Sequence, residues 1–550
     1  MVTDAFALAL HSHLPYVRGA GRWPHGEEWI HEAILGTYLP LLVVLHDLRD
    51  EGIRYRVTIG LTPTLLEQLA DPDIDDRFVE YVDDQIRRAE LDAWDLATAD
   101  ADRAALAELY RASYARLRDA YRLRFSGDIV GAFADLARTG EVEILTSAAT
   151  HGYLPLLDDR SVAAQLALGR SATERLTGLA PTGIWLPECA YRPGLERVLE
   201  AQGFTHFFTD ADLFLGRDVT PTPRRFGTSW PIRSGGGIAP QERLPADQLD
   251  AAGTAPTAAD LLRPYLVADS SVAAIARHPA LSGQVWSAAT GYPGDPAYRE
   301  FHRKDDRSGL RYWRVTAPTV ELGAKAPYRV AEAAARVRSH AAHFAAGVRR
   351  TLDAHRAVAG RSGLLATTFD SELFGHWWFE GIDWLDRVLR DLGPLTVTAA
   401  ERLAADPPQE RIPLAEGSWG AHNDHSTWQN PDTAWMWDGI GAAAAAVRAL
   451  AADPPEDGLR ARAADQALRE LLLLESSDWP FLVTTGQAVA YGAERFRSHA
   501  ERLRRCVALA AQGRPSDEGE LRGIERTDAV FPDARIAMLG PGSVSPVSPR

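Results

Sequence analysis

The sequence predicts an α/β fold in which parallel strands, covered by helices, close into a barrel. Short apolar runs such as Phe6 to Leu10, Val57 to Ile59 and Leu364 to Leu365 are followed closely by polar residues. Stretches with helical spacing separate many of these runs, as in Leu39 to Leu45 before the stop signal at Gly52. Alternating strands and helices build parallel sheets, and in a closed barrel the active site forms where the strands end.

Composition and charge limit the class of protein. The chain has 550 residues, of which 46% are hydrophobic and 24% are charged, so a wholly disordered or collagen-like chain is excluded. The 59 basic and 75 acidic residues give a net charge of −16. Because nucleic acids and anionic membranes are bound mainly by clustered cations, we expect neither as a partner.

The cellular location is predicted from cysteines and from the N-terminus. The only cysteines are Cys189 and Cys506, which excludes a disulfide scaffold and an all-cysteine zinc site. The apolar run from Ala5 to Leu10 is too short for a signal peptide or a membrane span. The sequence therefore predicts a soluble cytoplasmic protein.

The strand and helix patterns divide the chain into domains. We expect residues 1–95 and 179–405 to form the barrel. Residues 96–178 interrupt its rhythm with a helical stretch rich in Ala, Leu and Arg, from Arg103 to Arg124, and are predicted to be an inserted, mostly helical subdomain.

Helical patterns replace strand signals after about residue 405. We expect a C-terminal helical domain over 406–530 and a disordered tail rich in Ser and Pro over 539–550. Residues 222–270 are rich in Pro, Gly and Ala and are predicted to form a surface loop.

Two carboxylates follow predicted strands. Glu188 lies between Trp185 and Tyr191, and Asp370 follows the apolar run that begins at Leu364. Two carboxylates from different strands are the minimum equipment for glycosidic bond chemistry, since one attacks and the other donates and then recovers a proton. Proximity to ionised Glu188 is expected to raise the pKa of Asp370 and keep it protonated. Either carboxylate alone could equally be a surface residue or an ion-paired residue.

His11 and His13 end the first predicted strand. In an extended backbone their side chains point to the same side, toward the barrel mouth. They could bind a metal, as in metal-dependent amidohydrolases, or form hydrogen bonds to a polar substrate, or have a purely structural role.

Tryptophan lies beside short polar residues at several places. Trp286 follows Gln284, while Trp419 and Trp428 bracket the segment from His422 to His425. Ring faces suit sugars, and short polar groups suit sugar hydroxyls, so these positions predict a carbohydrate groove. Packing in the core is the alternative for any single Trp.

Together these motifs make the chain similar to glycoside hydrolase family 57, and within it to the 1,4-α-glucan branching enzymes. The resemblance spans His11 to about Arg495. It rests on five segments in the family's order: His11 to Tyr16, His151 to Leu157, Trp185 to Tyr191, Thr368 to Gly381 and Glu475 to Phe481.

The resemblance implies a (β/α)7 barrel, an inserted helical domain and a C-terminal helical domain. It implies a retaining double displacement on α-glucan, without a metal or other cofactor, that breaks an α-1,4 bond and forms an α-1,6 branch. Glu188 matches the nucleophile and Asp370 the general acid/base. Positions matched to the substrate groove are His11, His13, His151, Asp478, Trp23, Trp29, Trp286, Trp419 and Trp428.

Other functions stay open at this stage. On the same scaffold, a 4-α-glucanotransferase or an α-amylase differs only in the acceptor. A metal-dependent carbohydrate deacetylase or amidohydrolase is a second alternative, although Ser371 stands where the deacetylase pattern has another Asp. A non-catalytic glycogen-binding protein is a third. Branching enzymes of this type carry an aromatic residue at the tip of a loop near 222–270, and Trp230 is the candidate here.

Overall fold

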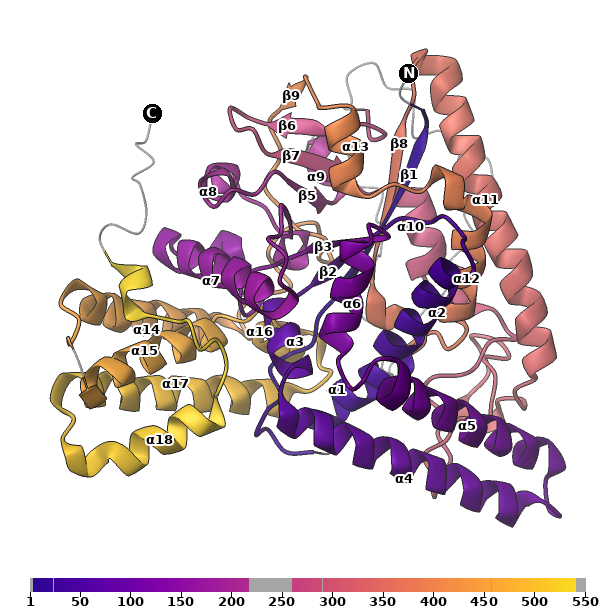
Figure 1. Ribbon diagram of the computed structural model, residues 1–550, viewed down its shortest axis with the longest axis horizontal. Coiled ribbons are helices and arrows are strands. Elements are labelled where there is room, and N and C mark those ends of the chain that lie inside the picture. Colours follow the sequence, from indigo (N-terminus) through magenta and orange to yellow (C-terminus); the bar gives the residue numbers. More distant parts are fainter. Residues whose placement is uncertain (1–2, 23, 217–259, 289, 457, 541–550) are drawn as a thin grey trace.

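Seven parallel strands form a closed ring in the computed structural model, which describes residues 3–22, 24–216, 260–288, 290–456 and 458–540 (Figure 1). Strands β3, β2, β1 and β8 form one sheet, and β4, β5 and β7 belong to a second. Parallel bridges join the two sheets at Thr146–Ile184 and Arg277–Ala366. The ring therefore closes, which confirms the predicted (β/α)7 barrel. Its strands are β1 (Ala5–Ser12), β2 (Val57–Leu61), β3 (Val142–Leu145), β4 (Gly183–Trp185), β5 (His206–Thr209), β7 (Ala273–Ala276) and β8 (Leu364–Asp370).

The strands are buried because helices cover their outer face. All eight residues of β1 are buried, as expected for a strand that is packed on both sides. The covering helices include α2 (Leu39–Asp50), α6 (Ile129–Arg138), α7 (Asp159–Thr177), α10 (Pro279–Trp286), α11 (Val330–Ala359) and α12 (Gly381–Leu392). Two short strands, β6 (Tyr265–Val267) and β9 (Arg411–Ile412), extend the second sheet beyond β7.

A pair of long helices projects from the barrel. Helices α4 (Pro72–Leu96) and α5 (Ala101–Asp119) lie side by side at the lower right of Figure 1. The π-helical turn Ala120–Arg124 continues α5, so the expected helical stretch is confirmed. The range 96–178 is nevertheless not purely an insertion, because it contains the barrel strand β3, whose short Val-Glu-Ile-Leu run pairs with β2.

Helices dominate the C-terminal part, as expected. They are α14 (Ala434–Ala452), α15 (Gly458–Leu474), α16 (Asp478–Thr485), α17 (Val489–Gln512) and α18 (Glu518–Thr527). The expected tail does not begin at residue 539, because Leu539 is fully buried at the end of the turn Ile536–Leu539. Residues 541–550 lie outside the described residues, as does Trp230, and 265–267 of the expected loop form β6.

One stretch, 27–50, is long and apolar enough to cross a membrane by length and composition alone. It comprises α1 (Glu27–Ala33), the π-helical turn Ile34–Tyr38 and α2. Within its most apolar window, 67% is buried inside the protein, where Leu39, Leu42 and Leu45 join the barrel core.

The close packing of α7 generates a testable prediction. A Cβ atom at Gly169 would lie 2.2 Å from the Ser147 carbonyl oxygen, which is backbone and cannot rotate away. We expect Gly169→Ala to lower the free energy of unfolding by about 1–3 kcal/mol and to lower the thermal midpoint. Gly441→Ala in α14 is the control, because a Cβ added there would meet nothing within 4 Å. Equal thermal midpoints for the two variants would contradict this packing.

Candidate active site

Glu188 follows β4 in a strained backbone conformation. It lies in the 3-10 turn Pro187–Cys189 with φ of 61°, a left-handed value that costs a residue other than glycine about 1–3 kcal/mol. The backbone N–H of Trp419 donates to the Glu188 carbonyl oxygen at 3.1 Å and helps to fix the turn. The strain lies at the residue that the sequence singled out for chemistry.

Two donors hold the Glu188 carboxylate. Trp419 Nε1 donates to Oε2 at 2.9 Å, and Ser477 Oγ donates to Oε1 at 2.8 Å. Burial raises the pKa of Glu188 above its ordinary value, while these two hydrogen bonds oppose the rise because they stabilise the ionised form. The side chain is 13% exposed, so one edge of the group remains accessible.

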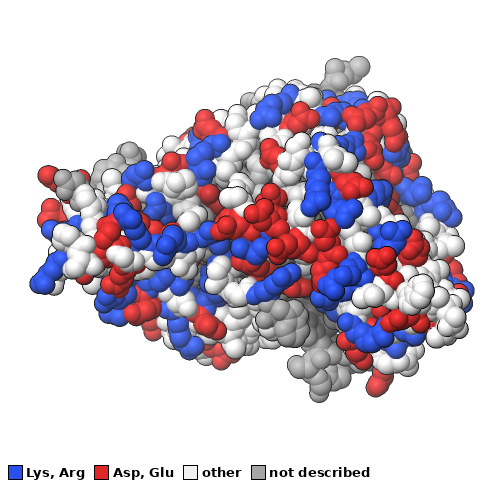
Figure 2. Space-filling view, turned by 60° about the horizontal axis from the view of Figure 1, so that its bottom comes forward, with Lys and Arg blue, Asp and Glu red and all other residues white. Residues whose placement is uncertain are grey.

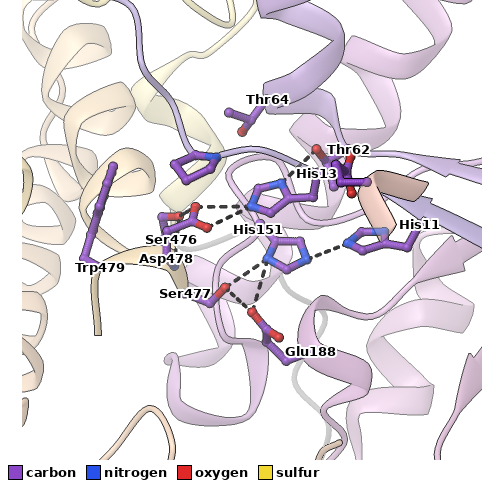
Figure 3. A network of polar contacts seen from close by, with 12 residues as sticks. His11, His13, Thr62, Thr64, His151, Glu188, Ser476, Ser477, Asp478 and Trp479 are labelled. Carbon is purple, nitrogen blue, oxygen red and sulfur yellow. Dashed lines mark hydrogen bonds and ion pairs between the residues drawn. The ribbon is translucent and has the colours of Figure 1, made fainter. Parts of the chain in front are cut away.

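A chain of hydrogen bonds leads to Glu188 from the barrel interior (Figure 3). His11 Nε2 lies 3.1 Å from His151 Nε2, and His151 Nδ1 lies 2.9 Å from Ser477 Oγ. Burial lowers the pKa of both imidazoles well below the ordinary value, so both rings are neutral at pH 7. Since the Ser477 hydroxyl proton is donated to Glu188, His151 must donate from Nδ1 and accept at Nε2 from His11.

His11 therefore supports neighbouring side chains and has little exposed surface for a sugar. It is 3% exposed and stacks on Trp185 with ring centroids 4.6 Å apart. Its Nδ1 faces Gly60 of the neighbouring strand, where an added Cβ would lie 3.4 Å away. The predicted role in direct substrate contact stays a prediction, and the structure gives His11 the position of an anchor for His151.

His13 is more accessible and is held by a carboxylate. Its Nε2 lies 3.1 Å from Asp478 Oδ1, and its Nδ1 lies 3.0 Å from Thr62 Oγ1. Burial lowers the pKa of His13, but Asp478, Glu188 and Glu372 together raise it above the ordinary value. Both nitrogens that a metal would need thus have partners. As predicted, His11 and His13 lie on one side of the strand, with rings 6.0 Å apart.

Asp370 ends β8, directly beside β1, where it is in register with His11. Its pKa is raised well above the ordinary value, first by burial, then by the charges of Glu372 and Glu188, while Arg277 opposes the rise. The expected effect of Glu188 is thus present, although burial and Glu372 contribute more. The charge of Glu188 therefore contributes to the ionisation of Asp370, which favours the protonated form.

Several polar residues of the site were missed from the sequence. Arg277 follows β7, and its Nη2 lies 2.5 Å from Asp210 Oδ2 after β5, in a nearly buried ion pair. The Arg277 guanidinium also lies 5.7 Å from the Trp419 ring centroid. Asp210 and Arg277 each directly follow an apolar strand run, which is a usable signal, and Ser477 lies within the segment Glu475 to Phe481, but neither pattern reveals what Arg277 and Ser477 contact.

Glu372 is a third buried carboxyl group beside the site. It accepts a hydrogen bond from Tyr38 Oη and another from the His13 backbone N–H at 3.2 Å. Burial raises the pKa of Glu372 to about 7. Its charge therefore depends on pH in the neutral range, and so does its influence on Asp370.

The predicted aromatic positions are used in different ways. Trp286 is half-buried, packs edge-on against Trp419 with centroids 6.0 Å apart, and donates from Nε1 to the Thr368 carbonyl at 3.1 Å. Trp428 does not fit the expected groove wall, because it is fully buried and stacks on Tyr153 at 4.5 Å.

Two further residues predicted to line the groove, Trp23 and Trp29, are near the N-terminus. Trp29 is half-buried and packs against Tyr491 with ring centroids 5.3 Å apart. Trp23 lies outside the described residues.

A separate group of possible metal ligands lies among the C-terminal helices of the described chain. Glu470, His499 and Asp528 are all buried, with ligand atoms within 4.8 Å of one another. Arg502 Nε lies 2.5 Å from Asp528 Oδ2 and 3.4 Å from Glu470 Oε2, so both carboxyl groups already pair with a guanidinium. We interpret it as an internal ion network of the C-terminal part.

Comparisons with known proteins identify the family of the chain. Residues 7–415 match the profile of Glycosyl hydrolase family 57, and the chain belongs to this family. Residues 440–538 match a second profile, "1,4-alpha-glucan branching enzyme, C-terminal".

Relatives cover nearly the whole chain. A 1,4-alpha-glucan branching enzyme of Thermococcus kodakarensis is 42% identical over 97% of this chain and 77% of that protein. The crystal structure of the Thermococcus enzyme has a TM-score of 0.87 at 38% identity, covering 98% of this chain and 97% of that one. An alpha-amylase structure from Thermotoga maritima has a TM-score of 0.82 at 30% identity, covering 99% of this chain and all (100%) of that one.

The contact between His13 and Asp478 predicts a change in titration. Removing the negative charge with Asp478→Asn leaves burial to dominate, so the pKa of His13 should fall. Histidine-selective NMR over a pH series measures it, with the His13 signal assigned by His13→Gln. Asp432→Asn, at an exposed position before α14, should leave the titration unchanged. An unaltered His13 midpoint in Asp478→Asn would show that this pair does not control the imidazole.

Proposed function

We propose that this chain is a retaining 1,4-α-glucan branching enzyme, with Glu188 as nucleophile and Asp370 as general acid/base. The observation that carries the assignment of roles is the difference between the two carboxyl groups. Glu188 accepts hydrogen bonds from Trp419 and Ser477 that favour its ionised form. Asp370 has its pKa raised well above the ordinary value by burial and by neighbouring carboxylates. Such a pair supplies one anion and one acid at the same pH.

In the first step, Glu188 attacks the anomeric carbon of an α-1,4-linked glucan. The glycosidic C–O bond breaks as Asp370 transfers its proton to the leaving oxygen, and a covalent glucosyl-enzyme forms. The two hydrogen bonds to Glu188 orient the carboxylate before the attack. The strained turn at Glu188 fixes the direction from which it approaches.

In the second step, the 6-hydroxyl of an acceptor chain displaces Glu188. Asp370, now ionised, takes the hydroxyl proton, and an α-1,6 bond forms with net retention. Water competes with the sugar acceptor at this stage. Trp286, packed edge-on against Trp419 beside Glu188, can shield the intermediate and offer a ring face to a sugar.

The donor sugar is expected to contact the more accessible polar groups. His13 and Asp478 are each 12% exposed in their side chains and hold one another in place. Both nitrogens of His13 already have partners, whereas the Asp478 carboxylate has further lone pairs with which it can accept a hydrogen bond from a sugar hydroxyl. His151, which is held by His11, orients Ser477 through a hydrogen bond.

A second candidate function is α-amylase activity, because the Thermotoga maritima structure is named an alpha-amylase and resembles the whole chain. The same first step would be followed by attack of water. The C-terminal profile over 440–538 and the 42% identity to a branching enzyme favour branching. The deacetylase alternative is disfavoured, because Ser371 stands where the metal-binding pattern of deacetylases has an Asp. Its Oγ is hydrogen-bonded to Ser12 Oγ at 2.7 Å.

The biological setting follows from the activity. A branching enzyme acts on amylose-like chains and on the growing polysaccharide, so we assign this chain to glycogen biosynthesis in the cytoplasm. A neutral polysaccharide is compatible with the net charge of −16.

Amylose turnover tests this assignment. We expect the wild type to remove iodine staining with few new reducing ends and to yield short side chains on enzymatic debranching. Glu188→Gln and Asp370→Asn should each lower the rate by about a thousandfold or more, and the exposed Glu520→Gln should not. Reducing ends released in step with the loss of colour would identify an amylase. Shuffled chains with nothing to debranch would identify a 4-α-glucanotransferase.

The hydrogen bond from Ser477 predicts a shift in the pH profile. The bond stabilises ionised Glu188, so Ser477→Ala should raise the pKa of Glu188 and move the acidic limb of kcat/KM to higher pH. The exposed Ser516→Ala serves as the control. An acidic limb that stays in place, with activity lost equally at every pH, would mean that Ser477 has only a packing role.

A further inference from the structure

A large cavity lies away from the two catalytic carboxylates. Its volume is about 1690 Å³, and it is bounded by α1, α2, the α4–α5 pair and the segment 299–311. Neither Glu188 nor Asp370 contributes to its lining. Small-molecule sites usually measure about 300–1,000 Å³, so this space suits an extended ligand.

Two arginines in this cavity have unsatisfied hydrogen-bonding capacity. Arg299 Nε and Arg311 Nη2 are buried without hydrogen-bond partners, and neither side chain forms an ion pair within the described part of the chain. Burial lowers the pKa of Arg311, and the positive charge of Arg299 lowers it further because like charges repel. Arg311 Nε donates to the Phe301 carbonyl oxygen at 2.7 Å, so each guanidinium has one hydrogen-bond partner and keeps further donors that a ligand with acceptor oxygens can engage.

Aromatic rings provide flat surfaces beside these donors. The Arg299 guanidinium lies 3.7 Å from the centroid of the Phe379 ring, and Arg299 Nη1 donates to Tyr110 Oη at 3.3 Å. Tyr110 and Tyr114 of α5 are stacked, with centroids 5.9 Å apart and an interplanar angle of 14°. Tyr81 and Tyr328 also line the cavity.

Carboxylates in the same cavity balance the positive charge. Glu380 is 4% exposed and accepts a hydrogen bond from the Arg299 backbone N–H at 3.0 Å. Glu32 lies 3.5 Å from Lys304 Nζ, and its pKa falls because His376, Lys304 and Arg311 outweigh the effect of burial. On the face shown in Figure 2, acidic and basic side chains are likewise interspersed. An anion would meet repulsion from both glutamates, whereas a neutral polyol could use donors and acceptors together.

We propose that this cavity is a second α-glucan-binding site, which holds a distant segment of the polysaccharide while the carboxylates act on another. The idea rests on the proposed function for its ligand. A long glucan tethered here would raise the local concentration of chain at the barrel mouth. The site should therefore matter for long substrates more than for short ones.

Calorimetry in the inactive Glu188→Gln background tests the site, with maltoheptaose as the probe. We expect Arg311→Gln and Tyr114→Ala each to remove one binding event. Arg111→Gln is the matched control, since Arg111 is on α5, pairs with Glu108 and lies outside the cavity. In the otherwise wild-type enzyme, Arg311→Gln should raise KM for long amylose by about tenfold and leave kcat unchanged. Tyr114→Ala provides the same readout if Arg311→Gln does not fold.

Three results separate the hypotheses. Unchanged maltoheptaose binding in both cavity variants would overturn the second site. Binding of inorganic phosphate that disappears in Arg311→Gln, with maltoheptaose unaffected, would also overturn it in favour of an anion site. If the wild type does not act on amylose at all, the proposed function itself is wrong. If the wild type acts on amylose but the cavity variants bind maltoheptaose unchanged, only the second site is refuted.

Discussion

The proposed active site depends on two hydrogen bonds that fix the Glu188 carboxylate. Trp419 and Ser477 supply them, and both residues lie beyond residue 415, where the match to the family profile ends. Ser477 is itself anchored to the barrel, because its backbone N–H donates to the His151 carbonyl at 3.0 Å. In the proposed mechanism the C-terminal segments are thus part of the catalytic apparatus, and the barrel supplies the carboxylates that they orient.

The two carboxyl groups differ in their tendency to ionise because their electrostatic environments differ. Both are desolvated, which favours their neutral forms, but Glu188 receives two donors, while Asp370 lies near the carboxylates of Glu372 and Glu188. Arg277 moderates the effect on Asp370 and is held by Asp210. The neutral His11–His151 pair adds orientation without adding charge.

The sequence predicted what is encoded locally. Apolar runs followed by polar residues revealed the barrel and placed Glu188 and Asp370 at strand ends, because strands and their carboxyl ends leave a local pattern. Arg277 also follows such a run, at the end of β7, and Ser477 lies within the segment Glu475 to Phe481, but their roles could not be read locally because they arise only when distant segments meet. Trp428 shows the converse limit: its polar neighbours suggested a groove, but whether a ring faces a sugar or the core is decided by tertiary packing. The strand β3 within the expected insertion reflects the same limit, because its short apolar run, Ile144 to Leu145, is assigned to the barrel only through its pairing with β2.

Trapping the covalent intermediate tests the central claim most directly. The Asp370→Asn variant would be incubated with 5-fluoro-α-glucosyl fluoride, which forms a glucosyl-enzyme that turns over slowly, and the protein would then be digested and analysed by mass spectrometry. The account predicts a fluoroglucosyl group on the peptide that contains Glu188, attached to that carboxylate. A label on another residue would contradict it, as would complete turnover of the reagent without any covalent adduct.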